Sequence, residues 1–424
     1  MIGWLIAAAA LLGAPLFAIF GTIALGAYHS IQLDPSIVVS ELARLATMPL
    51  LRALPLFALA GYVLAASRAS ERLLDLSRAA FGWMPGGLAL VSLIACTLLT
   101  AFTGASGVTI VALGGLLLPA LQQEGYGDRF SLGLVTSGGN MGVLFAPSLP
   151  LILFAVIANP IASEVTIDRL FLAALLPGAL TLAALGLYGV ATGLGRRVPR
   201  QPFSARALVR ALWAARWEAP LPVVVLGGIY SGRIAVSEAA VLTAAYTLIV
   251  EAVIQREVSL KRLAGVIRDS TMLVGGVLVI LGLGMAITNF LVDQEAPARL
   301  VEWAGRTFHH PVTFLIALNI FLLIVGCLMD VYTAIIVFVP MLIPLGLRFG
   351  VNPVHLGVIF LANLAIGYST PPVGMNLFIA AIRFERPLLK LAAASLSFIA
   401  ILLVVLLVIT YVPALSLALP GGAP

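Results

Sequence analysis

Long apolar runs follow one another along almost the whole 424-residue chain, and short polar or Gly/Pro-rich stretches separate them. A helix rises about 1.5 Å per residue, so about 20 apolar residues cross the ~30 Å hydrocarbon core of a bilayer. Hydrophobic residues make up 61% of the chain and charged residues 10%. A soluble domain would have about 25% charged residues. The pattern therefore predicts an all-α polytopic membrane protein embedded in a lipid bilayer.

Two of the apolar runs are too long for one crossing. Residues 86–122 and 313–347 would each form a helix much longer than the bilayer core is thick. The polar flanks of each run are assigned to one side of the membrane, so each run must return to the side it entered from. The sequence predicts two re-entrant helical hairpins with tips at AFTGASGV (101–108) and CLMDVYTA (327–334), entering from the cytoplasm and from outside, respectively.

Two further apolar segments, 131–157 and 357–383, are interrupted by helix-breaking residues. The interruptions read SGGNMGVLFAPSLPLI (137–152) and NLAIGYSTPPVGMNLF (363–378). Glycine permits unusual backbone conformations and proline removes an amide donor, and broken backbone survives at membrane depth only inside protein or beside a cavity. We expect two broken transmembrane helices whose free carbonyls face a cation and whose helix N-termini face an anion.

The two halves of the chain repeat these features. A shift of 225 residues aligns three pairs without a gap, namely Pro119 with Pro344, Gly142 with Gly367, and Pro147 with Pro372. The short apolar segment 219–232 adds one crossing between the halves and inverts the second copy. The predicted units are a first inverted repeat (1–193), an Arg-rich cytoplasmic linker (194–217), and a linking helix with the second repeat (218–424). Inverted repeats with discontinuous helices are the architecture of secondary transporters.

Charge gives the orientation. Arginine-rich loops, which are assigned to the cytoplasm by the positive-inside rule, are residues 66–79, 194–217, 255–268 and 383–390. Residues 158–168 contain two acids and no base and are assigned to the outside. This places the N-terminus in the cytoplasm and the C-terminus outside. The net charge of +6 is explained by the cytoplasmic loops, so no nucleic-acid partner is expected.

Four segments match a known pattern of glycine, serine and proline: FTGASGVTIVALGGLLLPAL (102–121), GNMGVLFAPSLPLI (139–152), GRIAVSEAA (232–240) and the continuous stretch 326–378. Together they resemble the large membrane (permease) subunit of the tripartite ATP-independent periplasmic (TRAP) transporters. The chain departs from that pattern at Ala105, Ala146 and Val236-Ser237.

The resemblance implies a multi-pass protein of the bacterial inner (plasma) membrane. It implies two partners in separate chains, a four-helix small membrane subunit and a periplasmic substrate-binding protein. It further implies sodium ions as coupling ions, a small organic anion as substrate, and membership of an elevator-type ion transporter superfamily.

Oxygen-bearing residues at the tips and breaks are the candidate cation ligands, because hydroxyls, carbonyls and one carboxylate suit a hard cation. The candidates are Ser106, Thr109, Gly139, Asn140, Asp330, Thr333, Asn363, Gly367 and Thr370. Asp330 stands out, since a charge inside an apolar segment costs a few kcal/mol or more. Each also has a structural alternative: Asp330 as a helix cap, the hydroxyls bonding to the preceding turn, and the amides capping broken ends.

The candidate substrate contacts lie at the first tip and in the proline-containing breaks. They are Gly104, Ser106, Pro147, Ser148, Pro371 and Pro372.

The predicted function is sodium-coupled import of a small organic anion, a carboxylate or sugar acid, delivered by a periplasmic binding protein. In the implied elevator mechanism, a body comprising roughly 86–157 and 313–383 slides against the remaining helices. The alternatives are a standalone ion-coupled carboxylate or cation transporter, a passive channel, and a membrane-embedded enzyme. The enzyme is disfavoured because the sequence has no HExxH, clustered Cys/His or nucleotide-loop motif.

Overall fold

The computed structural model describes residues 16–47, 53–84, 86–198, 202–231 and 233–421. These described residues form helices and no strand, and seven of their helices are long and apolar enough to cross a membrane. The number rises to nine if each of two sharply bent helix pairs counts as one span. The predicted all-α polytopic fold is confirmed.

The first half contains nine α-helices and a short 3₁₀ segment among its described residues: α2 (Leu16–Ser30), α3 (Ser36–Thr47), α4 (Ala53–Ala66), α5 (Ala69–Phe81), α6 (Gly87–Thr103), α7 (Ser106–Gln123), α8 (Asp128–Gly138), η2 (Met141–Leu144), α9 (Leu149–Ala158) and α10 (Ile167–Gly195). The segment between the halves forms α11 (Ala205–Ala214) and α12 (Pro220–Tyr230).

The described part of the second half has these elements: α13 (Val236–Leu248), η3 (Ile249–Ile254), α14 (Leu260–Asp293), α15 (Ala296–Thr307), α16 (Pro311–Leu328), α17 (Val331–Arg348), α18 (Pro353–Gly367), α19 (Met375–Phe384), α20 (Leu388–Tyr411) and α21 (Ala414–Leu417).

Both long apolar runs are split where the sequence places the tips. In the first run, the helix is interrupted at Gly104, which has a left-handed backbone (φ 66°), and at Ala105, which is extended. The second lies at Met329 and Asp330, both extended, and Asp330 caps the helix that follows. Gly104 suits its position because a residue without Cβ adopts positive φ at low cost. Re-entry into a membrane stays a prediction.

Both interrupted helices are broken as predicted. The first consists of α8, η2 and α9, with a bend of 43° before α9. The second consists of α18 and α19, separated by residues 368–374. Ser148 and Gly374 precede α9 and α19, and neither helix has a side-chain cap at its N-terminus.

The two repeats pack into each other. The second hairpin helix of each repeat lies against the second half of the other repeat's broken helix, α7 against α19 and α17 against α9. The first hairpin helix stays within its own repeat, α6 against η2 and α16 against α18. Phe154 of α9 and Phe360 of α18 meet in the shared core with ring centroids 5.6 Å apart. The broken helices are therefore buried in protein, where unpaired backbone is tolerated.

A glycine pair explains how closely the helices approach. A Cβ on Gly142 would lie 2.4 Å from the amide nitrogen of Ala101 on α6. A Cβ on Gly367 would lie 2.5 Å from the carbonyl carbon of Gly326 on α16. The offset of 225 that aligns Gly142 with Gly367 also aligns Ala101 with Gly326. Equivalent glycines thus make equivalent backbone contacts in the two halves.

Two amphipathic helices lead into the hairpins. Helix α5 follows α4 after a bend of 74° and packs on α6, and α15 links α14 to α16. The offset of 225 places Ala69–Phe81 on 294–306, close to the bounds of α15. We call α5 and α15 the arms. The sequence treated 66–79 as a loop, and this expectation is wrong because its apolar residues recur with helical spacing.

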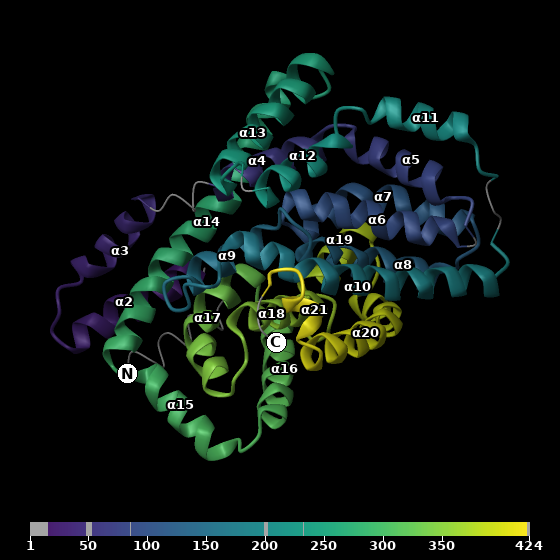
Figure 1. The fold of residues 1–424 in the computed structure, drawn as a ribbon. Coiled ribbons are helices and arrows are strands. Elements are labelled where there is room, and N and C mark those ends of the chain that lie inside the picture. Colours follow the sequence, from purple (N-terminus) through teal and green to yellow (C-terminus); the bar gives the residue numbers. More distant parts are fainter. Residues whose placement is uncertain (1–15, 48–52, 85, 199–201, 232, 422–424) are drawn as a thin grey trace.

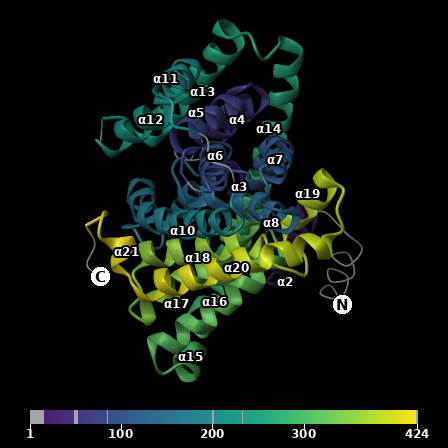
Figure 2. The same cartoon turned by 90° about the vertical axis from the view of Figure 1, so that its right-hand side faces the viewer.

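The remaining helices divide into two groups. Helices α2, α3 and α4 pack against α14, and α12 and α4 pack against α13; we call this group the scaffold. Helices α10 and α20 pack against the broken helices and one another. In Figure 2 the scaffold helices α4, α12 and α13 lie on one side with α5 and α11, and α10, α18 and α20 lie on the other. Figure 1 shows the long scaffold helix α14 running diagonally through the left part of the molecule, with α3 to its left.

Candidate functional site

A cavity of about 1110 Å³ lies between the scaffold and the two hairpin tips. One wall is formed by α4 and by a continuous face of α14 from Arg262 to Ile280. The other wall is formed by both tips and by parts of α7 and α19. The charged side chains that line it are Arg262, Asp269 and Asp330, and tyrosines 62, 332 and 368 add hydroxyls.

Helix α7 begins at this cavity. Its first residues, Ser106, Gly107 and Val108, line the wall, and no side chain caps the helix at Ala105. The first amides of a helix lack intrahelical partners and carry the positive end of its dipole. The tip of the first hairpin can therefore receive an anionic group from the cavity.

Hydrogen bonds join the tips and the second break. The Tyr332 hydroxyl in the second tip donates to the Gly104 carbonyl in the first tip at 2.8 Å. The Val331 amide donates to the Tyr368 hydroxyl. The Gly374 amide donates to the Cys327 carbonyl at 3.0 Å. Hydrogen bonds thus connect the parts of the wall that contains the two tips, which we call the inner wall of the cavity.

Behind the first tip, two asparagines connect the repeats. The Asn376 amide nitrogen donates to Asn140 Oδ1 at 2.8 Å, and Asn376 Oδ1 accepts from the Ser106 hydroxyl at 2.8 Å. The Asn140 amide nitrogen donates to the Ala365 carbonyl at 2.6 Å. All three polar side chains are buried. The predicted residues Ser106 and Asn140 are brought together through Asn376.

Two other predicted cation ligands of this region, Thr109 and Gly139, both contact the Thr100 hydroxyl. The Thr100 hydroxyl is 2.6 Å from the Thr109 hydroxyl and 2.8 Å from the Gly139 carbonyl oxygen. The hydroxyls of Thr136 and Ser137 are fully buried and have no hydrogen-bond partner among the described residues. A buried hydroxyl without a partner costs free energy, so these oxygens provide free lone pairs for a ligand.

Asp330 occupies two roles at once. It caps α17, with Oδ2 accepting from the Thr333 amide at 3.0 Å and Oδ1 accepting from the Thr333 hydroxyl. It is also half-buried and lines the cavity. The structural alternative for Asp330 and Thr333 is present in the structure, and their cation role stays a prediction.

Asn363 and Thr370 lie apart from Asp330. Asn363 is buried between helices and donates to Asn319 Oδ1 at 2.7 Å, and Asn319 donates to the Thr410 hydroxyl at 3.1 Å. The Thr370 hydroxyl donates back to the Ile366 carbonyl at 2.9 Å. Within the described part of the chain, no hydrogen bond joins either residue to Asp330. Their role as ligands of one shared site stays a prediction.

The predicted substrate contacts are spread over three places. Gly104 and Ser106 line the cavity. Pro147 follows a cis peptide bond, and Ser148 is buried, with a hydroxyl that has no partner among the described side chains and backbone. Pro371 and Pro372 are exposed and joined by a cis bond. Only the first pair faces the cavity.

Several residues of this region were not among the candidates from the sequence. Asn376, Tyr332 and Tyr368 all lie in the interrupted segment or the tip that the sequence singled out, so their polar groups were a usable signal. Arg262 and Asp269 gave no such signal, because only the fold brings α14 next to the tips.

An all-helical, multi-pass protein with paired hairpins and broken helices beside a central cavity has the architecture of a secondary transporter. The model of one protein family, the DctM component of the tripartite ATP-independent periplasmic transporters, matches residues 1–415. The chain belongs to this family. It is a transport permease of the inner membrane and not an enzyme.

Individual relatives agree on the family and differ in substrate. The chain is 33% identical to the C4-dicarboxylate TRAP transporter large permease protein DctM of Pseudomonas aeruginosa, over 88% of this chain and 86% of that one. It is 34% identical to the isethionate TRAP transporter permease protein DctMQ of Oleidesulfovibrio alaskensis, over 87% of this chain. The matched part is 58% of that longer relative.

The chain is also 30% identical to the 2,3-diketo-L-gulonate TRAP transporter large permease protein YiaN of Escherichia coli, over 80% of this chain and 79% of that one. Among solved structures, the Alcanivorax borkumensis YdaH transporter matches 91% of this chain and 89% of its own with a TM-score of 0.64 at 14% identity. That likeness is one of fold.

Proposed function

We propose that this chain is the permease of a sodium-coupled importer for a small organic anion that a periplasmic binding protein delivers. The observation that carries the proposal is the cavity of about 1110 Å³, whose inner wall consists of both hairpin tips. The substrates in the names of three relatives, a C4-dicarboxylate, isethionate and 2,3-diketo-L-gulonate, support an organic anion. The proposal also includes a small membrane subunit in a separate chain. Its support is the longer relative named DctMQ, of which the part matched by this chain is only 58%.

Anion binding is assigned to two features of the cavity. Arg262 on α14 supplies a full positive charge, and the uncapped N-terminus of α7 supplies free amides. Asp269 and Asp330 line the same space and disfavour anions elsewhere in it. An anion is therefore expected between Arg262 and the first tip.

Sodium binding is assigned to the oxygen atoms behind that tip. Ser106, Asn140 and Gly139 would hold the ion, together with the unpartnered hydroxyls of Thr136 and Ser137. These neutral oxygen donors fit a hard monovalent cation, which would supply positive charge behind the anion. Within the described residues no cluster of His, Cys, Asp or Glu is arranged to hold a metal ion, which favours such neutral donors. A second sodium site is assigned to Asp330 and Thr333.

Transport is proposed to follow an elevator mechanism. The moving body comprises the hairpins and broken helices, and we add α10 and α20 because they pack on α6, α8 and α18. The arms α5 and α15 connect this body to the scaffold. The structure places Arg262 in the first turn of α14 and not in a loop, but the segment 255–268 is still assigned to the cytoplasmic side by its charge. The cavity is therefore proposed to open towards the cytoplasm, which is the state that releases substrate.

Reconstituted uptake tests this function. Liposomes that contain this chain, its small subunit and its binding protein are expected to accumulate labelled anion only under an inward sodium gradient. Omitting any one component should abolish uptake. Asp330→Asn preserves a helix cap but removes the charge, so it should insert normally and require more sodium. Sodium-independent uptake by the complete system would contradict the proposed coupling.

The alternative of a standalone ion-coupled transporter is separated by the same experiment. It predicts robust uptake by this chain alone, without small subunit or binding protein.

A further inference from the structure

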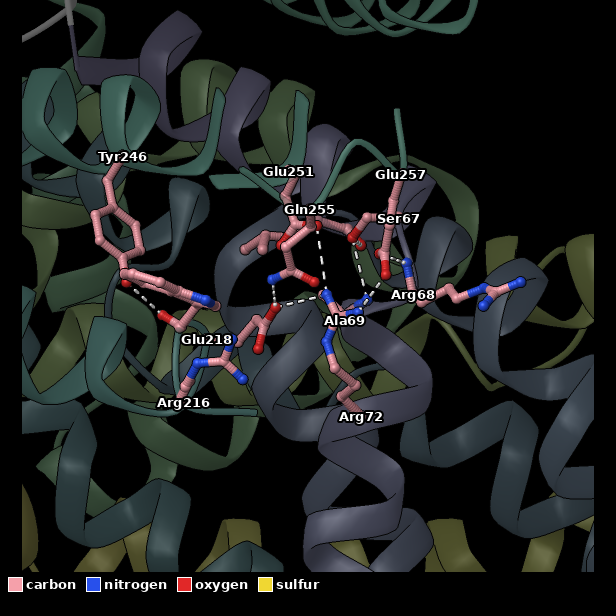
Figure 3. A network of polar contacts seen from close by, with 12 residues as sticks. Ser67, Arg68, Ala69, Arg72, Arg216, Glu218, Tyr246, Glu251, Gln255 and Glu257 are labelled. Carbon is pink, nitrogen blue, oxygen red and sulfur yellow. Dashed lines mark hydrogen bonds and ion pairs between the residues drawn. The ribbon is translucent and has the colours of Figure 1, made fainter. Parts of the chain in front are cut away.

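A second polar cluster lies outside the cavity, at the bend between α4 and the first arm. Figure 3 shows Arg72 of α5 facing three glutamates, Glu218, Glu251 and Glu257, which come from different parts of the scaffold region. Glu218 precedes α12, Glu251 lies in η3, and Glu257 lies just before α14. The proposed transport mechanism uses none of these residues.

Arg72 serves the three carboxylates unequally. Its Nη1 donates to Glu257 Oε1 at 2.6 Å, and its Nη2 donates to Glu218 Oε1 at 2.6 Å. Glu251 receives only a longer contact, from the same Nη2 to Oε2 at 3.4 Å. Arg72 therefore makes only a weak hydrogen bond to Glu251.

The other two glutamates have additional donors. Glu257 Oε2 accepts from the Arg68 amide at 2.8 Å, and Glu218 Oε1 accepts from the Gln255 amide group at 2.7 Å. Glu257 lies outside the candidate spans. Its burial raises its pKa, but the hydrogen bonds from Arg72 and the Arg68 amide outweigh burial and leave that pKa below its ordinary value. Glu257 is therefore ionised.

Glu251 is the most deeply buried member and the least satisfied. Its side chain is 0% exposed, and its Oε1 has no hydrogen-bond partner among the described residues. Glu218, which is 3% exposed, also has one oxygen without a partner in the described structure. Two carboxylates with free oxygens thus lie on the same nitrogen of one guanidinium.

The surrounding groups supply no further positive charge to Glu251. The Arg216 side chain donates to the Trp213 carbonyl and lies over the Trp213 and Trp217 rings, 5.0 and 5.6 Å from their centroids. The Tyr246 hydroxyl donates to the Trp217 carbonyl. Arg68 uses its backbone amide here and its side chain is exposed. The Ser67 hydroxyl donates to the Leu64 carbonyl and also lies against the Glu251 carboxyl group, but it carries no charge.

An isolated buried carboxylate is costly, and such a group becomes neutral instead. A metal ion is a poor alternative, because no acidic cluster in the described ranges has the arrangement to hold one. We propose that Glu251 is a proton-binding site and that the protonated cluster holds the start of α5, the first arm, against the scaffold. Loss of the proton would place three negative charges around one guanidinium and weaken this anchor.

The sign of the pH dependence follows from linkage. A folded state that keeps a proton which the unfolded chain releases loses stability as pH rises. Glu251→Gln is permanently neutral, so its melting temperature should match wild type at about pH 4, where an unfolded glutamate (pKa ~4.3) is still largely protonated, and exceed it at about pH 9. Glu257→Gln is the matched control from the same cluster. Its single amide oxygen replaces only one of the two acceptors that Arg72 and the Arg68 amide use, and it carries no charge, so it should melt below wild type at both pH values.

Infrared spectroscopy reads the proton directly. Wild-type protein at neutral pH should show the carbonyl band of a protonated carboxylic acid, which Glu251→Gln removes and Glu257→Gln retains. The proposal is overturned if wild type lacks this band, if the band survives in Glu251→Gln, or if Glu251→Gln melts below wild type at about pH 9. The wild-type spectrum decides even if the variant fails to fold. None of these measurements depends on transport.

Discussion

Asn376 is the residue that ties the two repeats to the first tip. It contacts Asn140 and the Thr136 carbonyl through its amide nitrogen and Ser106 through its oxygen. Removing it leaves the Ser106 hydroxyl and Asn140 Oδ1, both buried, without the hydrogen bond that each makes to Asn376, which costs about 1–3 kcal/mol. The same oxygens are assigned to sodium, so we expect the substitution to weaken sodium binding.

Asn376→Ala is therefore expected to raise the sodium concentration for half-maximal uptake by about fivefold to over a hundredfold. Sodium titration of uptake in reconstituted liposomes measures this change. The control is Asn159→Ala at the exposed end of α9, where the side chain bonds only local carbonyls. Equal sodium dependence in Asn376→Ala and wild type would remove this residue, and the network around it, from the cation site.

For single residues, the sequence located candidates where a polar side chain lies close to a helix-breaking residue. Ser106 and Asn140 could be singled out because each stands beside a glycine in an apolar run. Asn363 could be noticed because it lies in an apolar run four residues before Gly367, yet it lies among α16, α18 and α20 with Asn319 and Thr410. Which face of a helix a polar residue takes depends on packing that single residues do not encode.

At the scale of elements, the close approach of hairpin and broken helix depends on two glycines. A Cβ on Gly142 meets backbone atoms of Ala101 and Thr97 at 2.4 and 2.5 Å, and backbone cannot rotate away. Gly142→Ala and Gly367→Ala should therefore destabilise the fold by about 1–3 kcal/mol or more. Gly275→Ala on α14 meets no atom within 4 Å and should stabilise its helix by about 0.5–1 kcal/mol.

Thermal melting of the purified variants in detergent compares these cases. If Gly142→Ala melts at the same temperature as Gly275→Ala, the contact between η2 and α6 does not need a glycine.

Sequence patterns located the hairpins and broken helices well, because glycine and proline act on the local backbone. They missed both α5 and α11, which fall in stretches assigned to loop and linker on the basis of arginine content. An amphipathic helix at a membrane surface carries arginine as readily as a loop does, so charge alone does not separate the two.

At the scale of the whole molecule, the two groups of helices differ in their contacts. The scaffold helices α2, α3 and α4 pack on α14, whereas α10 and α20 pack with the hairpins and broken helices. The cavity lies between the groups, lined by α14 on one side and the tips on the other. The sequence predicted a moving body but could not place α14 opposite the tips, because that contact joins segments far apart in the chain.

We propose above all that the hairpins and broken helices move as one body against the scaffold. Distances between spin labels in the reconstituted complex test this motion, with labels at four well-exposed positions: Leu187 on α10, Val404 on α20, Val223 on α12 and Val292 on α14. The pair Leu187–Val223 spans body and scaffold. The pairs Leu187–Val404 and Val223–Val292 lie within the body and within the scaffold, and serve as controls.

We predict two distance populations for Leu187–Val223, with proportions that change on adding sodium and substrate, while both control pairs keep a single distance. A single Leu187–Val223 distance that stays the same with and without sodium and substrate would contradict the account.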